Sequence, residues 1–295
     1  MICKECPRRC GALRRPESGG GVCGVGEKLK ISKVMLHKWE EPCISGTNGS
    51  GAVFFSGCNL KCAFCQNSDI SFDGNGKYVS REEFSEIINE LKAKGAHNIN
   101  LVTPSHYAHT LADILKENPG LPVVYNCGGY ESIRSLKELN GKVQIYLADF
   151  KYALSFPAKK YSSAADYPEI CEKALEEMYN QVGDFELDEN GLMKKGLIVR
   201  HLVLPGNLEN SKRVIDVFMR LFGGKRVMLS LMGQYTPHGK VTSDIRFSEI
   251  NKKVSRTLYT KVCDYAAVCG VEYGYFQDIS SANEKYIPDF NIFKE

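Results

Sequence analysis

The chain lacks the features of a membrane or secreted protein. No apolar run approaches the roughly 20 residues that a helix needs to span a bilayer. The first residues, Met1-Ile2-Cys3-Lys4-Glu5-Cys6, do not form the apolar core of a signal peptide. We therefore expect a cytoplasmic protein without membrane contact, and for its twelve cysteines this compartment favours metal ligation over disulfides.

A large excess of charge of one sign is also missing. The 38 basic and 35 acidic residues leave a formal net charge of only +3, which gives no indication of binding to nucleic acid. Hydrophobic residues make up 43% of the 295 positions, enough for the core of one large α/β domain and a small appendage.

What the chain does have is a compact group of cysteines, Cys58, Cys62 and Cys65, spaced C-x3-C-x2-C. Three thiolates on one short loop can hold three irons of a [4Fe–4S] cube. The fourth iron is then left open to bind a substrate or cofactor directly, as open metal sites do. A zinc site, small buried core residues and chance spacing are the alternatives. Zinc is disfavoured because no fourth ligand follows Cys65 at a zinc-like spacing.

A second group of cysteines lies at the N-terminus, where Cys3, Cys6, Cys10 and Cys23 have the spacing C-x2-C-x3-C-x12-C. This glycine-rich stretch cannot build an apolar core, so a metal is expected to order it. Four thiolates suit a closed site for structural zinc or an auxiliary [4Fe–4S] cluster. Cys43 is an alternative ligand. We expect residues 1–50 to form a small metal-binding module with one strand, and residues 51–295 to form the main domain.

The main domain shows a repeated strand–helix alternation. Strands are predicted near residues 52–55, 98–102, 123–125, 143–147, 197–204, 227–231 and 271–275, and a further strand within 28–39. Helices are predicted near residues 80–95, 109–117, 133–139, 169–182, 212–222 and 248–269. Ser80 and Glu83 form a capping box at the start of the clearest helix.

Repeated strand–helix units predict a parallel sheet. Because no dinucleotide fingerprint follows the first strand of the main domain, the units favour a partial or complete parallel β/α barrel. Active sites of such barrels lie at the carboxyl ends of the strands, and the loop with Cys58, Cys62 and Cys65 follows the predicted strand 52–55.

With these patterns in view, the chain resembles the radical S-adenosylmethionine (SAM) superfamily, and within it the pyruvate formate-lyase activating enzymes. Phe64 gives the triplet the C-x3-C-x-(aromatic)-C form of that superfamily. A branch with an extra cysteine-rich N-terminus is the most similar. The likeness runs from about Gly51 to at least Gly239. Its other segments are Cys6-Pro7-Arg8-Arg9-Cys10-Gly11, Trp39-Glu40-Glu41-Pro42-Cys43, Asn100-Leu101-Val102-Thr103-Pro104, Tyr146-Leu147-Ala148-Asp149-Phe150-Lys151 and Arg200-His201-Leu202-Val203-Leu204-Pro205-Gly206.

The resemblance implies a radical SAM enzyme in which Cys58, Cys62 and Cys65 bind the cluster and SAM chelates the open iron. One electron, given by a flavodoxin- or ferredoxin-type donor, would cleave SAM to a 5'-deoxyadenosyl radical that abstracts a substrate hydrogen. The substrate is expected to be a glycyl-radical enzyme, as for an activating enzyme, or else a small molecule or peptide. A non-catalytic iron–sulfur electron-transfer protein is the alternative from another class.

The resemblance also implies residues that contact SAM. Asp149 and Lys151 match a D-x-K pair of the activating enzymes, and Arg200 matches an arginine that faces SAM. His238 lies near a SAM-contacting histidine, although the spacing departs. The Gly-Gly-Glu run of the activating enzymes is absent here, so Thr103 or Ser105 would take over the contact to the SAM amino group. A surface ion pair is the structural alternative for Asp149 and Lys151.

Three further residues are candidates for contact with the substrate. Cys127, His106 and His201 lie at predicted strand ends or within a strand, where each could touch substrate or relay a proton or hydrogen atom. A lone histidine or cysteine is more often structural, so the alternative for all three is a place in the core. Cys171, Cys263 and Cys269 lie on predicted helices and are interpreted as core residues.

Overall fold

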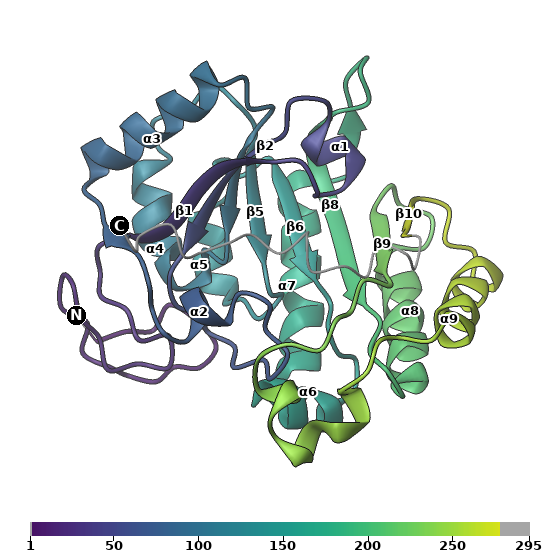
Figure 1. Cartoon of the computed structure of the whole chain (residues 1–295). Coiled ribbons are helices and arrows are strands. Elements are labelled where there is room, and N and C mark those ends of the chain that lie inside the picture. The colour runs from purple at the N-terminus through teal and green to yellow at the C-terminus, as the bar shows by residue number, and fades with distance from the viewer. Residues whose placement is uncertain (1, 278–295) are drawn as a thin grey trace.

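The computed structural model of the chain describes residues 2–277, in which ten strands form one sheet with helices packed along its outer side (Figure 1). The strand order is β10-β9-β8-β6-β5-β4-β2-β1-β3, and β7 pairs with β8 alone. The strands are β1 (Lys30–His37), β2 (Ser50–Phe55), β3 (Lys77–Tyr78), β4 (Ile99–Val102), β5 (Val123–Cys127), β6 (Ile145–Asp149), β7 (Glu186–Leu187), β8 (Met193–Leu202), β9 (Met228–Met232) and β10 (Gly274–Phe276).

The sheet is a partial β/α barrel. From β2 to β10 each strand is parallel to its neighbour, whereas β1 is antiparallel to β2 and β3. Within residues 2–277 no pairing joins β10 to the far end of the sheet, so the barrel does not close. The predicted parallel β/α architecture is confirmed, in its partial form.

The helices lie where the amphipathic pattern predicts them. They are α3 (Arg81–Ala93), α4 (Ala108–Ile114), α5 (Ile133–Glu138), α7 (Tyr167–Val182), α8 (Leu208–Phe222) and α9 (Arg256–Val268), with three short helices, α1 (Pro42–Ser45), α2 (Ser68–Ser71) and α6 (Ser155–Ser162). The predicted capping box of α3 is confirmed: Ser80 Oγ accepts from Glu83 N at 3.1 Å, and the Glu83 carboxylate accepts from Ser80 N at 2.7 Å. Within the described part of the chain, no helix has the length and apolar character that crossing a bilayer requires.

One predicted helix is wrong in its extent. Instead of a single helix over residues 248–269, the structure has a 3-10 helix at Ile245–Ile250 and the α-helix α9 from Arg256 onward. Two side chains divide the segment. Asp244 accepts from Arg246 N at 3.0 Å, and Ser255 Oγ accepts from Leu258 N at 3.2 Å. Each of these side chains caps the start of a separate helix, so the predicted helix over residues 248–269 is not continuous.

The strand of the N-terminal region belongs to the barrel sheet. Met35 pairs with Ala52 and His37 with Ser50, so β1 crosses the predicted domain boundary at residue 50 and adds a strand to the edge of β2. Residues 2–29, which we call the N-terminal segment, contain only two isolated bridges, and Glu5 accepts hydrogen bonds from His109 of α4 and Ser135 of α5. Arg14 fastens this segment, because its buried guanidinium donates to Gly26 O and, at 2.7 Å, to His106 O.

The short helix α1 closes the amino-terminal end of the barrel. Cys43 and Ile44 are buried against residues near the starts of the parallel strands, among them Val124, Ile145 and Met228. A polar cavity lies at the opposite end of the barrel, where the loop after β2 carries its cysteines.

We predict that Ile44→Ala lowers the free energy of unfolding by about 2–5 kcal/mol, because Ile44 is fully buried and the barrel end cannot collapse onto the void. Urea denaturation followed by circular dichroism measures this change. Ile245→Ala is the matched control, since Ile245 is 84% exposed and should change stability by no more than about 0.5 kcal/mol. Equal effects of the two substitutions would contradict the assignment of α1 as the closed end.

Candidate active site

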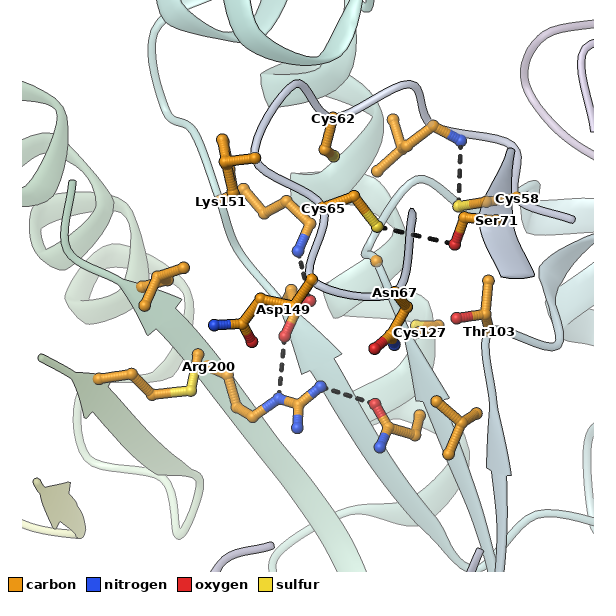
Figure 2. Close-up of a pocket in the computed structure, with 18 of the residues that line it drawn as sticks. Cys58, Cys62, Cys65, Asn67, Ser71, Thr103, Cys127, Asp149, Lys151 and Arg200 are labelled. Carbon is orange, nitrogen blue, oxygen red and sulfur yellow. Dashed lines mark hydrogen bonds and ion pairs between the residues drawn. The ribbon is translucent and has the colours of Figure 1, made fainter. Parts of the chain in front are cut away.

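The cysteine loop, residues 57–67, follows β2 at the carboxyl end of the sheet. Gly57 starts it with φ +83°, and a Cβ at this position would come within 2.6 Å of Cys23 O. A glycine is therefore required where the loop turns against the N-terminal segment. Cys58, Cys62 and Cys65 all line one cavity of about 270 Å³ (Figure 2).

The three thiols of this loop lie close enough to influence one another. Burial and, to a lesser degree, the nearby Cys62 raise the pKa of the Cys65 thiol to about 11. Burial also raises the pKa of the Cys58 thiol, and the nearby Cys62 and Cys65 contribute to the increase. Thiols with such raised pKa values stay protonated until a metal displaces the proton, and metal loading of this loop is therefore coupled to proton release.

The arrangement of the three thiols suits a cluster. They stand around a shared cavity, as they must if each binds a different iron of a cube. Each sulfur also has its own polar neighbour: Leu60 N at 3.4 Å from Cys58, Ser162 Oγ at 2.9 Å from Cys62 and Ser71 Oγ at 3.6 Å from Cys65.

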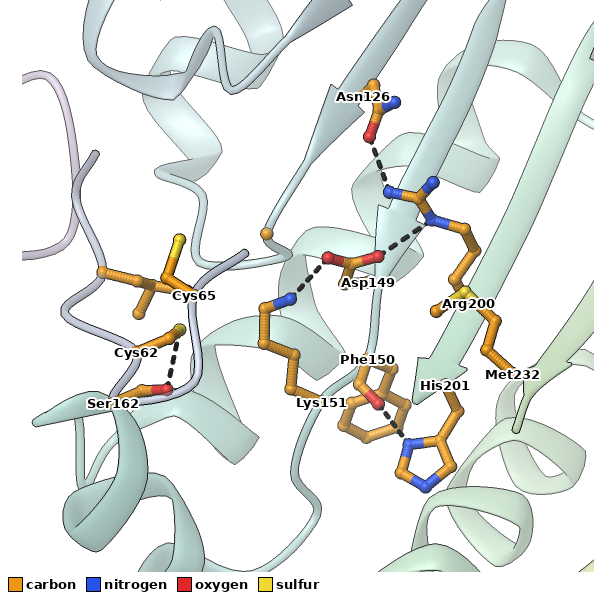
Figure 3. A network of polar contacts seen from close by, with 12 residues as sticks. Cys62, Cys65, Asn126, Asp149, Phe150, Lys151, Ser162, Arg200, His201 and Met232 are labelled. Atoms are coloured by element: carbon orange, nitrogen blue, oxygen red, sulfur yellow. Dashed lines mark hydrogen bonds and ion pairs between the residues drawn. The ribbon is translucent and has the colours of Figure 1, made fainter. Parts of the chain in front are cut away.

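An ion-pair network lies across the cavity from the cysteines (Figure 3). Asp149, at the end of β6, accepts from Lys151 Nζ at 2.5 Å and from Arg200 Nε at 2.9 Å. Asp149 and Arg200 are neighbours in the register of β6 and β8, so the sheet itself brings them together. Although burial opposes ionisation, Arg200 and Lys151 hold the pKa of Asp149 below its usual value. The network is therefore charged.

Three members of this network, Glu40, Asn100 and Asn126, were not identified from the sequence. Arg200 Nη1 donates to Glu40 Oε2 at 3.1 Å, and Arg200 Nη2 donates to Asn126 Oδ1 at 2.6 Å. Glu40 Oε1 in turn accepts from the amides of Asn100 and Asn126, at 3.1 and 3.0 Å. Glu40 follows β1 and reaches into the barrel. The signal available in the sequence was a pair of acidic residues between Trp39 and Pro42 in a segment already singled out for its resemblance.

Arg200 is held on three sides by protein acceptors. Each of its three nitrogens donates to a different residue, so the guanidinium is fixed in place and orients Asp149 where Arg200 lines the cavity. Lys151 Nζ uses one of its three donors on Asp149 and also lies near the Cys62 thiol. Lys151 is thus the cation placed between the cysteine loop and the network, as Figure 2 shows.

Thr103 stands at the end of β4 in a strained conformation. Its φ is +61°, which is an outlier for a β-branched residue, and its N–H donates to Asn126 O at 2.8 Å. Such strain is typical of binding and catalytic positions. Thr103 lines the cavity, with its hydroxyl on the side of Asn67 and Cys127 (Figure 2).

Of the predicted substrate-contacting residues, only Cys127 lines the cavity. It ends β5 and is 2% exposed, and burial raises the pKa of its thiol well above the usual value. Cys127 is therefore a neutral thiol at the edge of the site, able to touch a bound molecule but not charged.

The two histidines predicted to contact substrate lie outside the cavity, and that expectation is corrected. His106 Nε2 bonds to Ser56 O at 2.7 Å, and burial lowers the pKa of its imidazole to about 3. His201 bonds to Phe150 O at 2.8 Å and to Ser211 Oγ at 2.9 Å, and burial lowers its pKa to about 4. Both are neutral imidazoles whose hydrogen bonds are made to buried protein groups.

Ser105 and His238 do not line the cavity either. Ser105 Oγ donates to Glu131 Oε1 at 2.5 Å in the core behind β4 and β5, which turns it away from the site. His238 precedes the 3-10 helix Gly239–Thr242, and the cavity wall ends at Thr236. Of the two candidates for the SAM amino contact, the structure places Thr103 at the site.

The N-terminal cysteines form a looser group beside the cysteine loop. Burial and, to a lesser degree, the nearby thiols of Cys23 and Cys3 raise the pKa of Cys6 to about 12, whereas Cys10 is exposed. Cys43 is a core residue at the closed end of the barrel, so the expectation that it could act as an alternative ligand is corrected.

Arg8 joins the N-terminal segment to the cysteine loop. Its guanidinium donates to Asn59 O at 2.8 Å, to Ser162 O at 3.1 Å and to Ser163 O. Its carbon Cζ lies 5.2 Å from the ring centre of Tyr130. One arginine thus holds the backbone of the loop against the end of α6.

The fold and this cavity define a class of protein: a partial β/α barrel that presents three loop cysteines at the carboxyl end of its first parallel strand. The model of the Radical SAM superfamily matches residues 52–185, a stretch that includes the cysteine loop, Asp149 and Lys151.

The chain is also similar to individual proteins. It is 28% identical over 278 residues to the uncharacterized protein MJ0674 of Methanocaldococcus jannaschii, covering 90% of this chain and 74% of that protein. Among solved structures it resembles Streptococcus suis SuiB bound to precursor peptide SuiA, at 14% identity and a TM-score of 0.52, over 75% of this chain and 47% of SuiB. SuiB bound to SAM gives 14% identity and a TM-score of 0.50, over 78% of this chain and 47% of SuiB. The chain spans about half the length of SuiB, and the likeness supports the fold.

We predict that Glu40→Ala lowers the free energy of unfolding by about 3–5 kcal/mol, because it leaves Arg200 with one carboxylate fewer in a buried network. Guanidinium chloride denaturation measures it. Glu186→Ala is the matched control: it removes the ion pair to Lys195, whose side chains are 45% and 55% exposed, and should cost no more than about 1 kcal/mol. A negligible effect of Glu40→Ala would show that the network does not stabilise the barrel.

We also predict that Arg8→Ala accelerates amide hydrogen exchange in residues 58–65 roughly ten- to hundredfold, the effect of losing charge-assisted hydrogen bonds worth about 1.5–3 kcal/mol. Exchange read by mass spectrometry on the reduced protein measures this change. Arg15→Ala supplies the matched control, because Arg15 is exposed in the same segment. Unchanged exchange in Arg8→Ala would mean that the hydrogen bonds of Arg8 do not stabilise the cysteine loop.

Proposed function

We propose that the chain is a radical SAM enzyme in which Cys58, Cys62 and Cys65 hold a [4Fe–4S] cluster beside bound SAM. The observation that carries this proposal is the cavity itself, which has the three thiols on one side and the ion-pair network on the other. When bound, the two cofactors supply reductive cleavage of SAM and a 5'-deoxyadenosyl radical that takes a hydrogen atom from a substrate.

The protein side chains would bind and orient SAM. Lys151 has donors left for the SAM carboxylate, close to the cysteine loop. The hydroxyl and carbonyl oxygens of Thr103 can accept from the amino group, in place of the glutamate that this chain lacks. Asp149, kept ionised by Arg200 and Lys151, can accept from the ribose or the ammonium. His238 is not assigned such a contact.

An apolar wall completes the proposed site. Phe64 and Tyr235 meet edge to face with ring centres 5.8 Å apart, and Leu202 and Met232 continue the wall at the ends of β8 and β9. These side chains would cover the adenosyl part of SAM and keep water from a reactive radical.

The substrate we favour is a polypeptide, with activation of a glycyl-radical enzyme as the first hypothesis. The resemblance to the activating enzymes supports this hypothesis, and the structure of SuiB with its precursor peptide, which this chain resembles in fold, supports a polypeptide in general. Radical chemistry on a small molecule or on another peptide is the second hypothesis. Electron paramagnetic resonance (EPR) distinguishes them, since an activase generates a glycyl radical on a partner enzyme, whereas a small-molecule enzyme does not.

The proposed enzyme needs an electron donor, which we infer to be a flavodoxin- or ferredoxin-type protein of the cytoplasm. The N-terminal segment is proposed to hold a second metal, zinc or an auxiliary [4Fe–4S] cluster, through Cys3, Cys6, Cys10 and Cys23. The proximity of Cys6 to Cys3 and Cys23 supports this set.

The alternative of a non-catalytic electron-transfer protein accounts less well for the cavity. Electron transfer needs no ion-pair network opposite the cluster, nor a strained threonine at its edge. A buried set of charges kept in place by Glu40 and Asn126 is better explained by a polar ligand.

We predict that the anaerobically reconstituted, dithionite-reduced protein converts SAM to 5'-deoxyadenosine, and that Cys62→Ala reduces this release to background because one iron loses its ligand. Chromatography of the nucleoside measures it. Cys269→Ala is the matched control, since Cys269 ends α9 away from the cavity and should leave the release nearly intact.

Full activity of Cys62→Ala would overturn the cluster assignment. A wild-type protein with a complete cluster and no release of the nucleoside, in the presence of candidate substrates, would favour the electron-transfer protein.

A further inference from the structure

The end of α6 is bound to the cysteine loop by its backbone. Ala63 N donates to Tyr161 O at 2.7 Å, and Lys61 N donates to Ser162 O at 3.5 Å. The last carbonyls of a helix have no partner within the helix, and here the cysteine loop supplies their donors. Ser163 follows in the left-handed region, with φ +53°, and ends the helix.

At the centre of this junction a hydroxyl meets a cluster cysteine. Ser162 is fully buried, and its Oγ lies 2.9 Å from Cys62 Sγ (Figure 3). Cys62 is also the most deeply buried of the three cysteines in the loop. The hydroxyl of Tyr152, likewise fully buried, lies 2.9 Å from Ser162 Oγ. A chain of two hydrogen bonds therefore runs from Tyr152 through Ser162 to Cys62.

The direction of this chain follows from proton counting once iron is bound. A thiolate ligand carries no proton, so Ser162 must donate its only hydroxyl proton to Cys62. Ser162 Oγ can then only accept, and Tyr152 must donate to it. Burial raises the pKa of Tyr152 well above its usual value, so its proton stays in place.

We propose that Ser162 is a positioning residue that raises the reduction potential of the cluster through its hydrogen bond to Cys62, with Tyr152 fixing the direction of donation. This inference rests on the proposed cluster at Cys58, Cys62 and Cys65. Reduction brings one electron from the donor protein and one more negative charge to the cluster and its thiolates. A donor aimed at a sulfur stabilises that added charge, and hydrogen bonds to sulfur are among the factors that set such potentials. The hydrogen bond thus brings the cluster within reach of a biological donor.

The test is an EPR-monitored redox titration of the reconstituted full chain. In Ser162→Ala we expect the balance at a fixed potential to shift about tenfold toward the oxidised cluster, a midpoint about 59 mV more negative for a one-electron couple. Tyr152→Phe should shift it in the same direction by less. Ser162→Thr, which restores the hydroxyl, should return the midpoint to the wild-type value.

Ser163→Gly is the matched control. Ser163 offers only its backbone carbonyl to Arg8, and glycine tolerates its left-handed φ, so the midpoint should not move. Iron and sulfide content are measured for every variant, because a purely structural role of Ser162 would change cluster content without moving the midpoint.

The outcomes separate this inference from the proposed function. A fully loaded Ser162→Ala protein with an unchanged midpoint overturns the role of Ser162. If Ser162→Ala retains no cluster, Tyr152→Phe decides, and an unchanged midpoint there overturns the proposal. A shifted midpoint in a protein whose cluster neither binds nor cleaves SAM would support the hydrogen bond and overturn the enzyme.

Discussion

The site depends on the hydrogen bonds that Arg200 donates to three acceptors from different parts of the chain. Asp149 comes from β6, Asn126 from β5 and Glu40 from the segment that follows β1. A guanidinium in a barrel must find compensating charge, and each acceptor gains a fixed partner in return. The network therefore fixes the distances between the ends of β5, β6 and β8 and the segment that follows β1. The strained Thr103, whose N–H donates to Asn126 O, belongs to the same arrangement.

Local patterns predicted a large part of the fold. The capping box at Ser80, the alternation of strands and helices, and the cysteine loop after β2 each depend on residues adjacent in sequence. Helix α6 was not predicted, because Pro157 stands in its first turn and the segment has little amphipathic pattern. Its position against Cys62 depends on residues 100 positions apart, which no local pattern contains.

The sequence predicted which residue types form the candidate site, but not which of the side chains point into the cavity. Asp149 and Arg200 come together because parallel register aligns β6 and β8, and Lys151 follows Asp149 by two residues. Whether a polar residue faces the lumen or the helices is decided by the packing at each strand end. His106 and His201 each find buried partners outside the lumen, and Ser105 finds Glu131. Glu40 faces inward from a segment without regular structure, for which periodicity offers no prediction.

The clamp of Arg8 has a consequence for the order in which the molecule is completed. Arg8 is 51 residues from Asn59 and 154 from Ser162, and Cys62 is 100 residues from Ser162. During synthesis the three cysteines leave the ribosome before helix α6, which contacts them. Arg8 can make its contacts only after both the cysteine loop and α6 have been made. Closing loops of this length costs chain entropy and slows the formation of such contacts. The cysteine loop consequently acquires its final shape only after more than half of the chain has been made.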